Sequence, residues 1–188
     1  MKFEICGIKF SAHFFVVSLM ALCIISDTSL AVCVCFLSAV FHECGHLLAM
    51  LLCRIKPRSI TLRAFDIVID AQINKSFWVD VFITLSGPFL NFIFALIFMD
   101  ISKRIFYSNL VIGIFNLLPV KSFDGGHALY VFLARFMSEK CADIILKVIT
   151  FIFLLVFFVF SILLLFECKY NYSLLLISLY LTAILFIK

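Results

Sequence analysis

The chain has 188 residues, of which 65% are hydrophobic and 14% charged, and its mean hydropathy is +1.25. This composition excludes an ordinary soluble domain, in which about half of the residues are apolar, and predicts an integral membrane protein in a lipid bilayer. The formal net charge of +4 is explained by basic residues that flank membrane spans, so we expect no nucleic-acid partner.

Six apolar stretches predict membrane-spanning helices, because a helix needs about 20 such residues to cross the hydrocarbon core. The fourth is expected to be broken, since Asn116 to Gly126 contains a proline, two glycines, a lysine and an aspartate. No linker or internal repeat is evident, which predicts one domain over residues 1–188 and an all-α polytopic fold. The six predicted spans are residues 10–25, 29–53, 77–99, 105–136, 143–166 and 172–187.

Basic residues gather at both termini and in the loops after the second and fourth spans, so the positive-inside rule places both termini in the cytoplasm. The loop Ser59 to Gln72 has β-branched residues in partial alternation and a turn candidate from Ala64 to Asp66. It predicts a small cytoplasmic β-hairpin, with a polar loop of no special role as the alternative. An exposed strand edge there would allow an extended peptide to add to it.

The second span carries "FHECGHLLA", in which His42 and His46 are four residues apart and therefore lie on one helical face. Two imidazoles so placed suit Zn²⁺, and Glu43 can reach the same opening and act as a general base. The candidate for the third ligand is Asp124, the only acidic residue in the fourth span, where two glycines follow. His46 and Asp124 lie at similar predicted depths, nearer the cytoplasmic side.

Further polar residues in the spans have alternative explanations. Asn91 either bonds to a group near the zinc or serves packing, whereas Gly87 is interpreted as a packing residue. Asn116 either donates to the oxyanion of the reaction or satisfies backbone freed by Pro119. For His127, a satisfied histidine is the favoured interpretation over a contact with the site.

Three segments in this order, "FHECGHLLA" (Phe41 to Ala49), "SGPFLN" (Ser86 to Asn91) and "NLLPVKSFDGGHAL" (Asn116 to Leu129), resemble the signature segments of the site-2 protease family of intramembrane zinc metalloproteases. The similarity covers a three-span catalytic core, about residues 29–136, and is greatest to the branch of the stage IV sporulation protein FB. The CBS domain common in that branch is not seen here.

The resemblance implies zinc ligands at His42, His46 and Asp124, a general base at Glu43, and a substrate-facing loop with Asn116 and Pro119. It implies hydrolysis of peptide bonds in or near transmembrane segments of membrane proteins, in regulated intramembrane proteolysis and in a bacterial cytoplasmic membrane. Membrane regulatory subunits are further expected partners. The alternatives are an inactive relative and a membrane metal-binding or transport protein.

Departures from the family pattern fall on the surface that faces the substrate. Ser122 and Phe123 stand where the family often has Pro-Leu, and Ala64 to Asp66 replace a glycine-rich hairpin turn. The metal-binding residues themselves follow the pattern.

Overall fold

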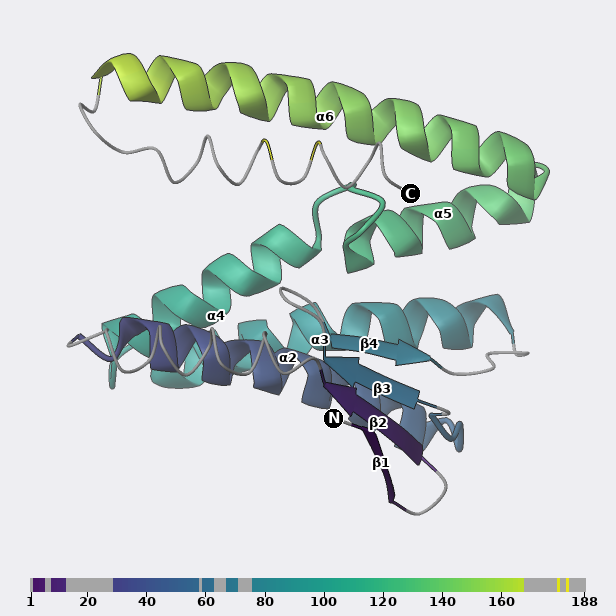
Figure 1. The fold of residues 1–188 in the computed structure, drawn as a ribbon, viewed down its shortest axis with the longest axis horizontal. Helices are drawn as coiled ribbons and strands as arrows, with labels where there is room; N and C mark the ends of the chain where they lie inside the picture. The colour runs from purple at the N-terminus through teal and green to yellow at the C-terminus, as the bar shows by residue number, and fades with distance from the viewer. Residues whose placement is uncertain are drawn as a thin grey trace. The chain divides into compact units, whose positions relative to one another are not determined.

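The computed structural model describes residues 2–5, 8–12, 29–57, 59–62, 67–70, 76–167, 179 and 182 (Figure 1). The chain divides into two compact units, Met1–Phe115 and Asn116–Lys188, and each is described by itself. The first unit contains β1 (Lys2–Ile5), β2 (Ile8–Ala12), α2 (Ala31–Leu52), β3 (Ser59–Leu62), β4 (Ile67–Asp70), α3 (Phe77–Phe98) and nearly all of α4 (Lys103–Asn116). The second unit contains α5 (Asp124–Phe136) and α6 (Glu139–Glu167).

Four strands form one sheet in the order β1-β2-β3-β4 (Figure 1). β1 and β2 pair antiparallel, β2 and β3 pair parallel with Phe10 opposite Ile60, and β3 and β4 pair antiparallel with Ile60 opposite Ile69. The hairpin expected in Ser59 to Gln72 corresponds to β3 and β4, which pair antiparallel, and the predicted turn, Ala64 to Asp66, lies outside the described residues.

The predicted helical character holds for the described residues, which contain the five helices α2 to α6. The predicted size of the β-structure was wrong, because β1 and β2 join the two strands of the hairpin in one sheet. The predicted start of the first span at residue 10 was also wrong, since residues 8–12 form β2 and pair with β3 about fifty residues away in the sequence. This pairing is non-local, so hydropathy along the chain does not reveal it. The rest of that span, and the sixth span apart from residues 179 and 182, lie outside the described residues.

Within the described ranges, three helices are long and apolar enough to cross a membrane: Ala31–Leu52, Phe77–Phe98 and Glu139–Leu164. Large apolar side chains such as Leu51, Trp78 and Leu96 are exposed on them, which lipid tolerates and water does not. The chain is accordingly an integral membrane protein. The fourth predicted span is interrupted as expected, because residues 117–123 between α4 and α5 are not helical.

Helices α2 and α3 of the first unit pack around a buried cluster of Ala49, Met50, Ile55 and Ile83. Hydrogen bonds at Ser38 of α2 also join helices of this unit to one another. The Asn109 Nδ2 atom of α4 donates to Ser38 Oγ at 3.0 Å, and the Asn91 Nδ2 atom of α3 donates to the Ser38 carbonyl at 3.4 Å. Hydrogen bonds between side chains and neighbouring helices hold helices together where lipid offers no hydrophobic driving force.

Helix α2 ends in a Schellman motif. The Ile55 N–H donates to the Met50 carbonyl at 2.8 Å and the Arg54 N–H to the Leu51 carbonyl at 3.0 Å. Arg54 occupies the left-handed position with φ of 56°, where glycine is usual. Ile55 packs beside Met50 in the buried cluster, as the motif requires.

This motif predicts different responses to two substitutions at Arg54. We expect Arg54→Val to lower the free energy of unfolding by about 1 to 2 kcal/mol, because a β-branched residue is strained at positive φ. Arg54→Gly should change it by less than about 0.5 kcal/mol, since relief of strain offsets the entropy of glycine. Thermal unfolding in detergent micelles would measure both, with Lys56→Val, at an exposed neighbour, as the control.

Candidate metal centre

The two histidines predicted as ligands lie together on the buried face of α2. His42 and His46 are 5% and 8% exposed, and their Nε2 atoms are 3.2 Å apart. The rings meet edge to face, with centroids 4.9 Å apart. Two nitrogens that each lie about 2.05 Å from a tetrahedral zinc are about 3.3 Å apart, so the spacing of this pair fits a shared metal ion.

The ring of His46 is fixed by a backbone carbonyl of α3. Its Nδ1 atom lies 2.8 Å from the carbonyl oxygen of Ile83, which can only accept, so Nδ1 carries the proton. Ser86 Oγ donates to the same oxygen at 2.6 Å. In the neutral ring the lone pair is then on Nε2, the atom that faces His42. Histidines that bind metals usually donate their other ring N–H in this way.

Two glycines let α2 and α3 approach closely at this point. A Cβ atom on Gly45 would lie 2.6 Å from the Ser86 carbonyl oxygen and 2.9 Å from the Gly87 Cα atom. A Cβ atom on Gly87 would overlap Nε2 of His46 and lie 2.8 Å from Nε2 of His42. The sequence analysis assigned Gly87 to packing alone, and the structure shows that it also leaves room beside the Nε2 atoms of His42 and His46.

Asn91 is fully buried, and its side-chain amide donates to the carbonyl of Ser38, one helical turn before His42. The proposed bond near the zinc therefore stays a prediction, while an interhelical bond is observed. Asn109 was missed by the sequence analysis, although an amide in an apolar stretch of α4 was a signal for such a contact. Glu43 is half-buried on α2, directly after His42.

The remaining predicted site residues belong to the second unit. Asp124 is the first residue of α5, and Asn116 and Pro119 are half-buried before it. A Cβ atom on Gly125 would overlap the Leu117 carbonyl oxygen, so the loop lies directly against the first turn of α5. The structure describes the two units separately, and Asp124 as third ligand therefore stays a prediction, as does the role of Glu43.

His127 lies on α5 with an exposed side chain, and its backbone N–H donates to the Phe123 carbonyl at 3.0 Å. This backbone bond closes the first turn of α5 above the loop. The role of the imidazole stays a prediction.

The chain is similar to known proteins in sequence and in fold. Residues 100–157 match the model of Peptidase family M50. A solved structure, the site-2 protease from Methanocaldococcus jannaschii, aligns with 96% of this chain and 91% of its own, at 24% sequence identity and a TM-score of 0.70. The fold of the chain is thus that of a site-2 protease. A comparison with curated proteins gives no match.

The contact between Gly87 and the imidazoles predicts the effect of one methyl group. We expect Gly87→Ala to weaken Zn²⁺ binding at least about tenfold, because its Cβ displaces both Nε2 atoms. Titration of the purified protein with Zn²⁺ against a competing chelator would measure this affinity. Gly113→Ala is the matched control, since the three atoms nearest to its Cβ all belong to the Phe92 ring, at 3.0 to 3.3 Å. Equal Zn²⁺ affinity in Gly87→Ala and Gly113→Ala would contradict the prediction that His42 and His46 bind the metal.

Proposed function

We propose that the chain is a member of the site-2 protease family and acts as an intramembrane zinc metalloprotease. The observation that carries the proposal is the buried pair of Nε2 atoms, 3.2 Å apart, with the His46 Nδ1 atom held by the Ile83 carbonyl. The match to Peptidase family M50 and the shared fold support it.

In this proposal His42, His46 and Asp124 would hold Zn²⁺, and three protein ligands are the number found in catalytic zinc sites. Two imidazoles and one carboxylate form a donor set that suits zinc. When bound, the ion supplies a Lewis acid that acidifies water and polarises a carbonyl group. The close approach at Gly45 and Gly87 keeps the two imidazoles at a fixed separation, so the donors are pre-arranged.

Glu43 is the proposed general base. Its carboxylate takes a proton from the water that attacks the scissile carbonyl and then delivers this proton to the leaving amine nitrogen. Asn116 offers a side-chain N–H to the oxyanion that develops on the carbonyl oxygen. Pro119 lies three residues after Asn116, in the loop that follows α4, and contributes to the surface that faces the substrate.

The proposed substrates are proteins cut in or near a transmembrane segment. Their amides are hydrogen-bonded within a helix, so the helix must unwind before attack, and helix-breaking residues are expected near the cut. The sheet order makes β1 and β4 the outer strands, and an unwound peptide can add to the edge of β4 (Figure 1).

We further propose the branch of the stage IV sporulation protein FB, a bacterial cytoplasmic membrane with both termini in the cytoplasm, and membrane regulatory subunits as partners. The support is the sequence resemblance and the distribution of basic residues. Regulated intramembrane proteolysis is the corresponding role.

Two substitutions separate metal binding from proton transfer. We expect His46→Ala to lose bound zinc and cleavage together, because one ligand is removed. Glu43→Gln should keep about one zinc per chain but lower kcat about 10² to 10⁴-fold, the range for loss of a general base. Zinc content can be measured by elemental analysis, and cleavage with an internally quenched synthetic transmembrane peptide that carries a central Gly-Pro break.

Cys44→Ser is the control, since Cys44 lies between these residues in sequence but is assigned no role. A wild-type protein that binds no zinc would contradict the proposed metalloprotease function. Zinc without cleavage of membrane peptides, in wild type and control alike, would favour an inactive relative or a metal-binding protein.

A further inference from the structure

The loop Leu117–Phe123, which connects α4 to α5, is anchored to α6 by apolar contacts. Val120 and Leu154 are each 2% exposed and form a buried cluster, with Leu118, Phe123 and Phe153 packed around it. Within the loop, the Phe123 N–H donates to the Val120 carbonyl at 2.8 Å. The loop therefore has a defined conformation and ends directly at Asp124.

Thr150 of α6 makes hydrogen bonds on both sides of Val120. Its Oγ1 atom accepts from the Lys121 N–H at 3.1 Å and donates to the Pro119 carbonyl at 3.3 Å. Thr150 is 1% exposed. Since one hydroxyl binds a donor and an acceptor of the loop backbone, it fixes the orientation of two successive peptide groups.

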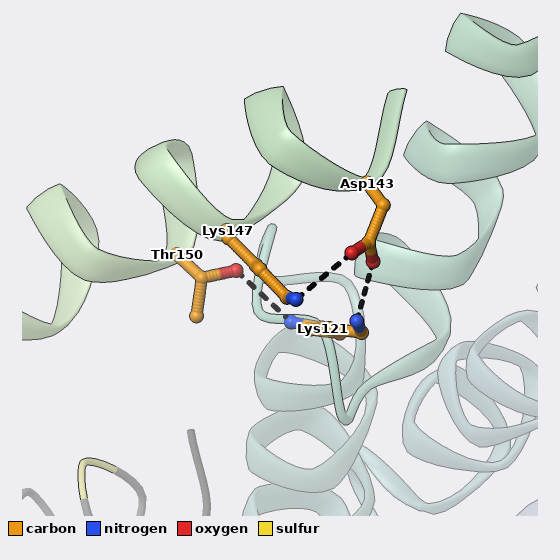
Figure 2. Close-up of polar contacts among 4 residues, drawn as sticks. All are labelled: Lys121, Asp143, Lys147 and Thr150. Atoms are coloured by element: carbon orange, nitrogen blue, oxygen red, sulfur yellow. Dashed lines mark hydrogen bonds and ion pairs between the residues drawn. The ribbon is translucent and has the colours of Figure 1, made fainter. Parts of the chain in front are cut away.

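Asp143, two turns before Thr150 on α6, binds the same loop through a side chain. Its carboxylate forms an ion pair with Lys121 of the loop, and Lys147 of α6 also contacts it at 2.9 Å (Figure 2). Figure 2 shows the contacts of Lys121 with Asp143 and Thr150, both on α6. The two lysines differ in one respect, because only Lys121 connects α6 to the loop.

The burial of these groups ranks the two attachments. Lys121 and Asp143 are each about one-third exposed, and ion pairs in such positions contribute little. Thr150 is buried, and without its hydroxyl the Lys121 N–H and the Pro119 carbonyl would lose this partner in an apolar setting. Thr150 is therefore the principal attachment and Asp143 a secondary one.

We propose that Thr150 is a positioning residue, assisted by Asp143, that holds the loop Leu117–Phe123 in the conformation in which Pro119 faces the substrate and Asp124 can bind zinc. This inference rests on the proposed protease function. The sequence analysis assigned no role to Thr150 or Asp143. A catalytic site whose third ligand follows a loop needs such support from a rigid element.

The first experiment compares Thr150→Val, which keeps the shape but removes the hydroxyl, with Thr150→Ser, which retains it. In the zinc-free protein, we expect hydrogen exchange of the segment 117–126 to be about tenfold faster in Thr150→Val and unchanged in Thr150→Ser. In the zinc-loaded protein, cleavage of the quenched peptide should show a kcat lowered about tenfold or more in Thr150→Val, as expected when reacting groups are misplaced. The KM of Thr150→Val should change less than threefold, and Thr150→Ser should have the kcat of the wild type.

The second experiment compares Lys121→Met with Lys147→Met. Each removes one ion pair to Asp143, but only Lys121→Met releases the loop, so only this variant should speed exchange in 117–126, and by less than Thr150→Val does. Circular dichroism would check that all variants keep their helices.

The outcomes are distinguishable. Unchanged exchange and kcat in Thr150→Val would overturn the positioning role, whatever the activity of the wild type. Slow exchange in wild type and fast exchange in Thr150→Val, in a protein that binds no zinc, would support the loop attachment and overturn the protease function on which its catalytic meaning rests. Equal exchange in Lys121→Met and Lys147→Met would overturn the part assigned to Asp143.

Discussion

The first unit is organised by the hydrogen bond from His46 Nδ1 to the carbonyl oxygen of Ile83. Gly45 and Gly87 let the backbones of α2 and α3 approach closely beside this bond. Pro88, which follows, has no N–H, yet α3 continues through it. The bond thus links α2 to α3 and sets the direction of the His46 lone pair.

Buried polar groups have different structural roles in the two units. In the first, Ser38 receives Asn91 and Asn109 and so joins three helices one turn before His42. In the second, Thr150 attaches an irregular loop to a long helix. Irregular backbone at membrane depth is tolerated only where protein or water satisfies it. The interruption of the fourth predicted span is therefore accompanied by a buried side chain, Thr150, that forms hydrogen bonds with the loop backbone.

The sequence predicted what is local and missed what is distant. The spacing of His42 and His46 predicted a shared helical face, Pro119 and the glycines predicted the interruption, and β-branched residues indicated the strands β3 and β4. The parallel pairing of β2 with β3 depends on residues far apart in the chain, so no local pattern predicts it. The sequence did not indicate the contacts of Thr150 with the loop or of Gly87 with the two imidazoles, because the partners lie on other elements and are brought close only by folding.

The close crossing of α2 and α3 has a mechanical consequence. With almost no side-chain volume between Gly45 and the backbone of Ser86 and Gly87, the helices cannot slide past each other without collision, and Asn91 joins them again two turns away at Ser38. Close packing and this hydrogen bond thus hold α2 and α3 together at two places. In the proposed protease, a motion that admits a substrate to the histidines would therefore be made by segments other than α2 and α3.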